Sequence, residues 1–504
     1  MKKLLQFPWY PLLFAVYPTA ALLSYNIGQV KYTAGIRALA LSLLVVLPLF
    51  LLLRLIYRNA ARAAVVASAL VILFFSYGQV YDQVTKKWKL PALNAWMLGL
   101  WLALAILAFV LAALPRIEFG KATLALNVAA LALVLYSLGQ VTWWSFPHQT
   151  RAGPEYASLE TLSAPAGQTP PDIYYFILDS YGSAGLLQDA YGYDNSAFVS
   201  FLEKRGFYVA SCSQSNYGRT ELSLGSSLNM DYLQNLDDTF TPDNIDRTHL
   251  WNDIHTSTVR LDLEKAGYKT VAFATGFAFT ELEDADVYIA PSLAFSSLTG
   301  FETLLLRTTA LQPLVTQGTL NLDRIDGQRY RERFQAVFDS MDRLARMPGP
   351  KFVFIHLVSP HPPFVFGPDG SFTDPDRFLN SDHLYPANLY AEGYQNQLTY
   401  LNAQVEAAVS TLIAGSATPP VIILQGDHGP WIQTGSNQFR ILNAYYLPGH
   451  EDQLYPTISP VNTFRLVLDS YLGAGYPLLE DKSYYSPTPK LYQFTPVANP
   501  CAGH

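Results

Sequence analysis

Candidate metal-ligating side chains follow two apolar, β-rich segments of the chain. Asp179 comes directly after residues 173–178, and Asp427 and His428 follow residues 421–424 across a Gln-Gly pair. Ligands of open α/β sheets gather at the carboxyl ends of the strands. Two carboxylates and one imidazole there suit a divalent ion such as Zn²⁺, Mn²⁺ or Mg²⁺. Taken singly, each residue is also explained as part of a strand-end turn, where Asp is common for backbone reasons.

A metal-dependent reaction at such a site also needs a nucleophile, and Thr220 is the candidate. The segment 215–224, SNYGRTELSL, passes from a loop into an expected helix, with Thr220 at the helix start and Glu221 in the first turn. An ordinary Thr N-cap explains this pattern. In the functional interpretation, the helix N-terminus stabilises an anion and the metal lowers the pKa of the hydroxyl.

The elements that must position these residues alternate along the second half of the chain. Short β-rich runs alternate with helical stretches, which predicts one α/β domain over residues 172–504 with a largely parallel, doubly covered sheet. The segment before it, 146–171, is rich in Pro, Gly, Ser and Thr and predicts a linker. The expected strands are 173–178, 208–210, 270–274, 352–358, 421–424 and 441–447, and the expected helices include 257–266, 330–346, 390–413 and 461–472.

The first 145 residues predict an all-α transmembrane bundle. Five apolar runs contain no Asp, Glu, Lys or Arg: 8–26, 38–53, 63–81, 90–114 and 122–144. A span needs about 20 apolar residues, so we expect five helices over residues 1–145. Because the runs lack the charged groups that transport requires, this region is expected to act as an anchor and a platform for access to lipid. The loop charges weakly favour a cytoplasmic N-terminus, which puts the second half outside.

Composition excludes several classes of protein. Only 14% of the 504 residues are charged, against about 25% in soluble domains. Residues 1–150 carry 12 basic and 2 acidic residues, and the remainder carries 21 basic and 38 acidic ones. The acidic second half would repel a phosphate backbone, so no nucleic-acid partner is expected. The chain has two cysteines, Cys212 and Cys501, which excludes a disulfide-rich scaffold and a cysteine-based zinc cluster. A single disulfide between them is compatible with this count.

Four motifs taken together point to a family. LDSYG, SNYGRTELSLGSSLN, HLVSPHPPF and QGDHG occur in this order over residues 170–450. Their combination resembles the sulfatase-like branch of the alkaline phosphatase superfamily. It is most similar to the membrane-anchored members, which are lipoteichoic acid synthases, phosphoglycerol transferases and phosphoethanolamine transferases. The resemblance implies an alkaline-phosphatase-like α/β catalytic domain carried outside the membrane by about five spans.

The resemblance also implies roles for the residues at matching positions. Asp179 is expected to be the first metal ligand, and Thr220 both the nucleophile and a metal ligand. Asp427 and His428 complete the metal site. His361, in the HLVSPHPPF motif, is expected to contact the phosphoryl group or its leaving group.

Two departures from the family pattern limit the expected chemistry. Thr220 is followed by Glu-Leu-Ser rather than standing in the C/S-x-P-x-R context that formylglycine sulfatases need, which argues against sulfate-ester hydrolysis. Phosphoethanolamine transferases have a further His soon after the DHG motif, whereas here the next one is His450. One metal ion rather than two is therefore expected.

Other residues near the motifs have weaker assignments. Tyr181, Asn216 and Arg219 flank the ligand and nucleophile positions and are candidates for substrate binding, although a solvated loop residue explains Arg219 equally well. His356 lies inside an expected strand, and a satisfied core histidine is favoured over a site role. In an exported domain, a Cys212–Cys501 disulfide would tie the C-terminal tail to the domain.

The function expected from these features is a metal-dependent phosphotransferase in the bacterial inner membrane. It would move a phosphoglycerol or phosphoethanolamine headgroup from a membrane phospholipid, through a phosphothreonine intermediate, to an envelope glycan or lipid acceptor. The first alternative is an extracytoplasmic phosphodiester or phosphate-ester hydrolase with the same site. The second is a non-enzymatic, membrane-anchored binding protein, which would show no dependence on metal.

Overall fold

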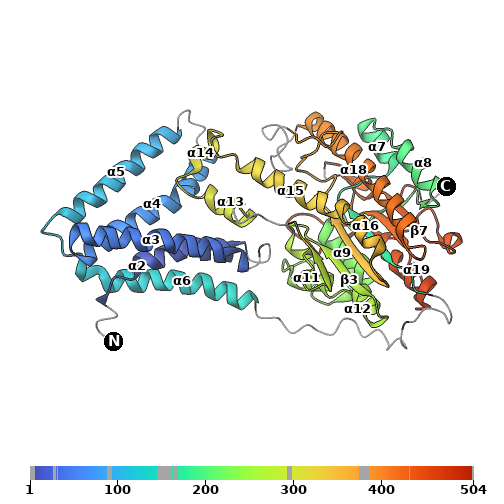
Figure 1. Ribbon diagram of the computed structural model, residues 1–504, viewed down its shortest axis with the longest axis horizontal. Coiled ribbons are helices and arrows are strands. Elements are labelled where there is room, and N and C mark those ends of the chain that lie inside the picture. Colours follow the sequence, from blue (N-terminus) through green and yellow to red (C-terminus); the bar gives the residue numbers. More distant parts are fainter. Residues whose placement is uncertain are drawn as a thin grey trace. The chain divides into compact units, whose positions relative to one another are not determined.

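The structure is a computed structural model, and it describes residues 6–26, 30, 32–87, 93–145, 162, 169–291, 298–373, 386–430 and 432–501. The chain forms two compact units, shown in Figure 1. The first contains residues 1–149 and 293–326, and the second contains residues 150–292 and 327–504. This division differs from the predicted boundaries because a segment of the second half, 293–326, packs with the N-terminal helices. The predicted linker, 146–171, falls almost wholly outside the described residues.

The first unit consists of helices. Four stretches among the described residues are long and apolar enough to cross a membrane: Tyr32–Tyr57, Ala60–Thr85, Leu93–Ala113 and Phe119–Trp143. The remaining predicted span corresponds to a helix of 16 residues, so the expected count of five is not reached by length. The helices of this unit are α2 (Tyr10–Tyr25), α3 (Ile36–Tyr57), α4 (Ala60–Lys87), α5 (Leu93–Ala113), α6 (Thr123–Ser145), α13 (Gly300–Arg307) and α14 (Gln312–Thr316).

The second unit is built on a mostly parallel sheet. Its strands are β1 (Ile173–Leu178), β2 (Tyr208–Val209), β3 (Lys269–Phe273), β4 (Val287–Ile289), β5 (Lys351–Leu357), β6 (Val421–Gly426) and β7 (Asn443–Tyr446). Their order in the sheet is β2-β7-β6-β1-β5-β3-β4. Strand β7 is antiparallel to both of its neighbours, and the other pairs are parallel. The predicted α/β domain with a largely parallel sheet is confirmed.

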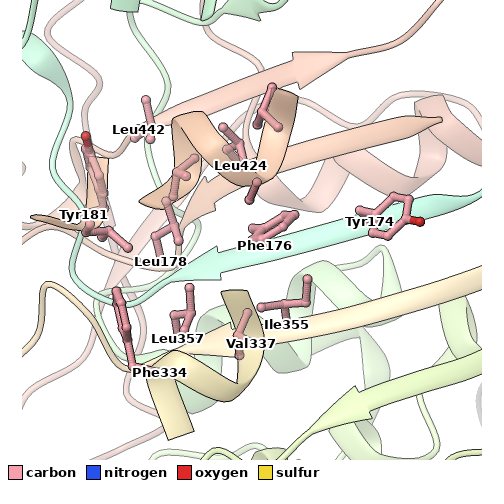
Figure 2. Close-up of a cluster of buried hydrophobic side chains, with 14 of the residues drawn as sticks. Tyr174, Phe176, Leu178, Tyr181, Phe334, Val337, Ile355, Leu357, Leu424 and Leu442 are labelled. Atoms are coloured by element: carbon pink, nitrogen blue, oxygen red, sulfur yellow. The ribbon is translucent and has the colours of Figure 1, made fainter. Parts of the chain in front are cut away.

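Helices cover both faces of this sheet. Alternate residues of β1 belong to two separate cores, because successive side chains of a strand point to opposite faces. Tyr174, Phe176 and Leu178 pack in one core with α15, α16 and α18, and Figure 2 shows Phe176 and Leu178 near Ile355 and Leu357 of β5. The helices of this unit are α7 (Ala184–Tyr191), α8 (Ser196–Lys204), α9 (Thr220–Asn229), α10 (Leu233–Leu236), α11 (Thr248–His255), α12 (Thr258–Lys265), α15 (Leu322–Asp339), α16 (Met341–Arg346), α18 (Ala387–Gly415) and α19 (Pro460–Leu472).

A second, two-stranded sheet lies near the C-terminus. Strands β8 (Ser483–Tyr485) and β9 (Thr495–Val497) pair antiparallel. Tyr484 also forms a bridge to Tyr217, and its backbone N–H donates to Asn216 O at 2.8 Å. The small sheet therefore packs beside the loop that leads into α9.

A buried ion pair fixes the amino-terminal ends of the central strands. The Lys351 side chain is 0% exposed, and its ammonium group binds the carboxylate of Asp172, which is 11% exposed. Asp172 also accepts the Lys351 backbone N–H at 3.2 Å, and its carbonyl accepts Val421 N–H at 2.8 Å. The residue before β1 thus contacts the first residues of both β5 and β6.

We expect Asp172→Ala to destabilise the second unit strongly. The substitution leaves the Lys351 charge buried and unpaired, which costs about 3–5 kcal/mol. Thermal unfolding of the full chain in detergent should therefore occur about 10 °C lower. The double variant Asp172→Leu with Lys351→Met, which removes both charges, should recover most of the loss. An unchanged unfolding temperature for the single variant would contradict this account of the pair.

Candidate active site

The central strands bring the predicted ligands together at one edge of the sheet. Leu178, the last residue of β1, is paired with Gly426 of β6 and with Leu357 of β5. Because the three strands are parallel, the residues that follow them meet at the same edge. Asp179 follows β1 directly and Asp427 follows β6 directly, so their carboxylates become neighbours.

Asp179, Asp427 and His428 form a compact, buried group. Each offers one ligand atom, and these atoms lie within 4.8 Å of one another. His428 Nε2 lies 3.7 Å from Asp179 Oδ1 and 3.5 Å from Asp427 Oδ2. Carboxylate oxygens and an imidazole nitrogen are the donors that Zn²⁺ and similar divalent ions take in proteins.

Two hydrogen-bonding details show that this group fits a cation. Asp427 Oδ1 accepts the backbone N–H groups of Ser180 and His428, each at 2.9 Å, but Asp427 Oδ2 is buried without a hydrogen-bond partner among the described residues. Such an oxygen is costly unless an ion contacts it. His428 Nδ1 lies 2.7 Å from Gly429 O. A proton on Nδ1 satisfies that carbonyl and leaves the Nε2 lone pair for a metal ion.

The electrostatics of the two carboxylates support the same conclusion. Burial by itself would raise the pKa of Asp179, but the imidazoles of His361, His356 and His428 outweigh burial and hold this pKa well below its usual range. Burial, and then the charge of Asp179, raises the pKa of Asp427. Two adjacent buried carboxylates oppose each other's ionisation, and a divalent cation between them relieves that repulsion.

The hydroxyl of Thr220 lies beside this group. Its Oγ1 is 3.3 Å from His428 Nε2. Helix α9 begins at Thr220 and Arg219 is the N-cap residue, and within the described structure the helix has no side-chain cap hydrogen bond. The N-cap explanation of Thr220 therefore does not hold, because its side chain is directed to His428 instead. The partial positive charge of a helix N-terminus favours an anion at this point.

Ser180 is a site residue that the sequence did not reveal. Its φ is +64°, a left-handed conformation that costs a non-glycine residue about 1–2 kcal/mol. In this conformation its Oγ lies 3.2 Å from Asp179 Oδ1 and 3.4 Å from His428 Nδ1. The strained turn aims the Ser180 backbone N–H at Asp427, and strain of this kind gathers at functional sites. Nothing in the local sequence besides its place after Asp179 marks this residue.

His361 lies at the same edge through its backbone. Its N–H donates to Asp179 O at 3.1 Å, and its own carbonyl accepts Gln397 Nε2 at 3.0 Å. The side-chain Nδ1 lies 2.6 Å from Pro362 O. These contacts hold the imidazole of His361 near Asp179, whose pKa its charge lowers.

His356 is closer to the site than a plain core residue would be. It is buried in β5, its Nε2 lies 3.4 Å from Asp179 Oδ2, and its Nδ1 lies 3.0 Å from Thr280 Oγ1. The interpretation as a satisfied core histidine accounts for its burial but not for its contact with the carboxylate. The sequence feature that indicates this role is a histidine inside a strand whose carboxyl end lies at the same edge of the sheet as Asp179 and Asp427.

Replacing His356 with Asn should weaken metal binding while the fold is kept. Residues that orient a metal ligand contribute about 10–100-fold to affinity, and we expect a loss of that size in a Mn²⁺ or Zn²⁺ titration of the full chain. His450→Asn is the matched control, since His450 packs on the ring of Tyr471 at 4.7 Å. Equal affinity in the two variants would show that His356 only fills space.

Two predicted substrate residues are corrected by the structure. Tyr181 is fully buried, its hydroxyl bonds Asn402 and Asn195, and it lies in the core shown in Figure 2. Asn216 is fully buried, and its side-chain amide bonds Ser459, Lys482 and Val461. Their polar atoms are used within the fold, so both residues support the neighbouring loops and neither lines a substrate pocket.

Arg219 lines a cavity next to the start of α9. The cavity has a volume of about 550 Å³ and is walled by Gly218, Arg219, residues 433–435 and 438–439, and residues in and next to the C-terminal small sheet. The Arg219 guanidinium bonds Thr488 Oγ1. Hydroxyl and amide side chains supply most of its other polar groups, namely Gln433, Thr434, Gln438, Tyr485, Ser486, Thr488 and Thr495.

A disulfide joins Cys212 and Cys501 across 289 residues of sequence. Cys212 precedes the loop that leads to Thr220, and its carbonyl also accepts Asn499 Nδ2 at 2.9 Å. The C-terminal tail, including the small sheet at the cavity, is thereby fastened to the loop that carries the candidate nucleophile.

The sulfatase family model matches residues 171–459, more than half of the 504 residues. The chain therefore belongs to the sulfatase family, as its motifs predicted, and it is an enzyme. Membership in this family speaks against the alternative of a non-enzymatic binding protein.

Solved structures of low sequence identity are similar to this chain. The C-terminal periplasmic domain of EcEptC from Escherichia coli, in complex with Zn, is 14% identical with a TM-score of 0.43 over 66% of this chain and 94% of that one. The integral membrane lipooligosaccharide phosphoethanolamine transferase A of Neisseria meningitidis is 14% identical with a TM-score of 0.38 over 93% and 96%. A protein in the alkaline phosphatase superfamily from Vibrio parahaemolyticus is 11% identical with a TM-score of 0.38 over 67% and 79%. A comparison with curated protein sequences gives no match.

Proposed function

We propose that this protein is a membrane-anchored, metal-dependent phosphotransferase that moves a phospholipid headgroup to an acceptor hydroxyl through Thr220. The observation that carries the proposal is the 3.3 Å contact between Thr220 Oγ1 and His428 Nε2. It supports a role for the hydroxyl beside the buried group of Asp179, Asp427 and His428. A nucleophile next to a cation site at a helix N-terminus is suited to attack on a phosphodiester.

One divalent ion, held by Asp179, Asp427, His428 and Thr220, would supply charge stabilisation and a lowered pKa for the Thr220 hydroxyl. The roles of the residues themselves then follow. The Thr220 hydroxyl first loses its proton to solvent, and Thr220 Oγ then forms a bond to phosphorus as the bond from phosphorus to the diacylglycerol oxygen breaks. His361 gives a proton to the departing oxygen. The headgroup phosphate is left on Thr220 as a phosphodiester.

The second half of the reaction reverses these roles. An acceptor hydroxyl gives its proton to His361 and attacks the phosphorus, and the bond to Thr220 Oγ breaks. The hydroxyl and amide side chains in the cavity next to the start of α9 support a hydroxyl-rich acceptor such as an envelope glycan. Arg219 at its wall would pair with a phosphate oxygen.

The proposal includes a location. We infer five spans with a cytoplasmic N-terminus and the catalytic unit on the outer side of a bacterial inner membrane. The four long apolar helices support the membrane assignment. The Cys212–Cys501 disulfide supports the outer side, since disulfides persist in oxidising compartments.

Product analysis tests the proposal and separates it from the hydrolase alternative. The full chain is reconstituted with Mn²⁺ in vesicles of phosphatidylethanolamine and phosphatidylglycerol, with and without a polyol acceptor such as glycerol. A transferase releases diacylglycerol and forms a new phosphodiester of the polyol. Release of the free headgroup phosphate at an unchanged rate, with no polyol product, would instead assign the site to a hydrolase.

A further inference from the structure

An apolar groove runs along the membrane helices of the first unit. It has a volume of about 720 Å³ and is lined by α3, α4 and the 298–309 segment that contains α13. Leu41 and Val45 line it and are also 52% and 65% exposed. The groove is therefore open to the surface that membrane helices present to lipid. Its volume lies within the range of about 300–1,000 Å³ that is typical of sites for small molecules.

The wall formed by α13 is held in place by backbone contacts with α4. Gly78 N–H donates to Thr308 O at 2.9 Å, and Phe74 O accepts Ala310 N–H at 2.7 Å. A Cβ at Gly78 would lie only 1.9 Å from Arg307 O, so a residue with a side chain would push the segment away. These contacts make the groove a built feature of the unit.

The groove has one charged end. Arg37 lies in the first turn of α3 and forms a two-bond ion pair with Glu302 of α13. The Glu302 side chain is 6% exposed, whereas that of Arg37 is 30% exposed. The carboxylate thus orients the guanidinium, which keeps some of its surface accessible. A guanidinium in this setting matches a phosphate group.

The length of the groove matches one leaflet of a bilayer. Its lining on α3 runs from Arg37 to Leu49, which is about 18 Å along a helix axis at roughly 1.5 Å per residue. Half of the hydrocarbon core is about 15 Å thick. A ligand with a phosphate at one end and an apolar chain as long as a single leaflet fits this shape.

We propose that the groove binds one acyl chain of a diacyl phospholipid, with the lipid phosphate at Arg37. The acyl chain fills the space between α3, α4 and α13, and the phosphate binds the accessible side of the guanidinium. This site shares no residue with the metal group. Lipid binding there is measured without turnover, so the proposal is tested independently of the phosphotransfer chemistry.

Photolabelling in the reconstituted full chain tests the proposal. Phosphatidylethanolamine with a diazirine on one acyl chain is mixed into vesicles of phosphatidylethanolamine and phosphatidylglycerol, and labelled peptides are quantified after irradiation. We expect residues 41–49 and 300–307 to be labelled more strongly than the exposed apolar surface of α5. Ser42→Trp fills the groove and should lower labelling of 300–307 by about tenfold. Displacing about two methylene groups of the acyl chain from the groove already weakens binding by about that factor.

Matched variants keep the test specific. Ala40→Trp places the same bulk on an exposed position of α3 outside the lining and should leave the labelling unchanged. Equal labelling of 300–307 in both Trp variants would overturn the acyl-chain site. So would labelling no stronger than that of α5.

A second comparison tests the phosphate contact. Arg37→Gln combined with Glu302→Gln keeps a neutral hydrogen-bonding pair and avoids a buried unpaired carboxylate. It should lower labelling by the phospholipid about tenfold, as expected for loss of a charge-assisted contact, but not labelling by a diazirine-bearing diacylglycerol. Arg54→Gln, at the other end of α3, is the control. Unchanged phospholipid labelling in the double variant would overturn the assignment of Arg37.

Discussion

Replacing Thr220 with alanine is expected to reduce turnover of phospholipid by at least about 10³-fold, because loss of a nucleophile costs several orders of magnitude. The Thr220 hydroxyl is the group that lies 3.3 Å from His428 Nε2, and alanine removes it without changing the backbone of α9. Thr220→Ser keeps a hydroxyl at the same position and should keep measurable activity. Diacylglycerol release from vesicles by the full chain is the measurement.

The control for this substitution lies one turn further along the same helix. Ser223 is fully buried, and its hydroxyl has no hydrogen-bond partner in the described structure. Ser223→Ala should therefore keep both the fold and the activity. If Thr220→Ala remained fully active while its metal content was normal, the nucleophile would have to be another group.

Asp427→Asn is expected to remove the metal ion and, with it, the activity. The amide keeps the oxygen that accepts the backbone N–H groups of Ser180 and His428. It replaces Oδ2, which is buried and has no hydrogen-bond partner in the part of the chain that the structure describes, with an NH₂ group. Substitution of residues that only orient a metal ligand already lowers metal affinity by about 10–100-fold. Substitution of the ligand Asp427 itself should therefore lower it by more than about 100-fold. Titration with Mn²⁺ or Zn²⁺ and measured metal content give the result directly.

Asp194→Asn is the matched control for Asp427→Asn, since it makes the same chemical change and removes the same charge. Asp194 is exposed in the same unit and accepts Ser196 N–H at 2.9 Å, which an amide oxygen can also do. This variant should bind metal and turn over lipid as the parent does. A full complement of tightly bound metal in Asp427→Asn would contradict the assignment of the ligand group.

The central strand of the sheet can be predicted from the sequence because its apolar pattern agrees with its burial in the fold. Residues 173–178 were predicted as a strand and form β1 with the same bounds, since a continuous apolar run is typical of a strand buried on both faces. The helix expected over 330–346 is instead two helices, α15 and α16, with a break at Ser340. A continuous periodic pattern does not reveal such a break.

The elements missed by the sequence are those that depend on distant partners. Strand β4 has three residues and owes its conformation to parallel pairing with β3. Strands β8 and β9 are equally short and pair with each other. Segments of this length carry too little periodicity to be recognised alone. The same holds for residues 293–326, whose packing with the membrane helices rests on contacts such as Gly78–Thr308.

The sequence indicates which ligand candidates lie together where a motif follows a strand, but it does not show contacts that depend on neighbouring elements. Asp179, Asp427 and His428 come together because parallel strands end at one edge. Tyr181 and Asn216 sit beside motif residues in sequence, but their polar atoms turn into the fold. His356 shows the reverse case, because its contact with Asp179 arises from neighbouring strands β1 and β5.

The most direct test of the central claim is a mass measurement on the peptide that begins at Thr220. Trypsin cleaves after Arg219 and next after Arg247, so residues 220–247 form one peptide. The full chain is incubated with Mn²⁺ and bacterial phospholipids, quenched in acid and digested. We predict a phosphoglycerol or phosphoethanolamine mass on Thr220, absent from the alanine variant. Continued release of diacylglycerol with this peptide unmodified at every time point, and no loss of activity in the alanine variant, would contradict covalent phosphotransfer through Thr220.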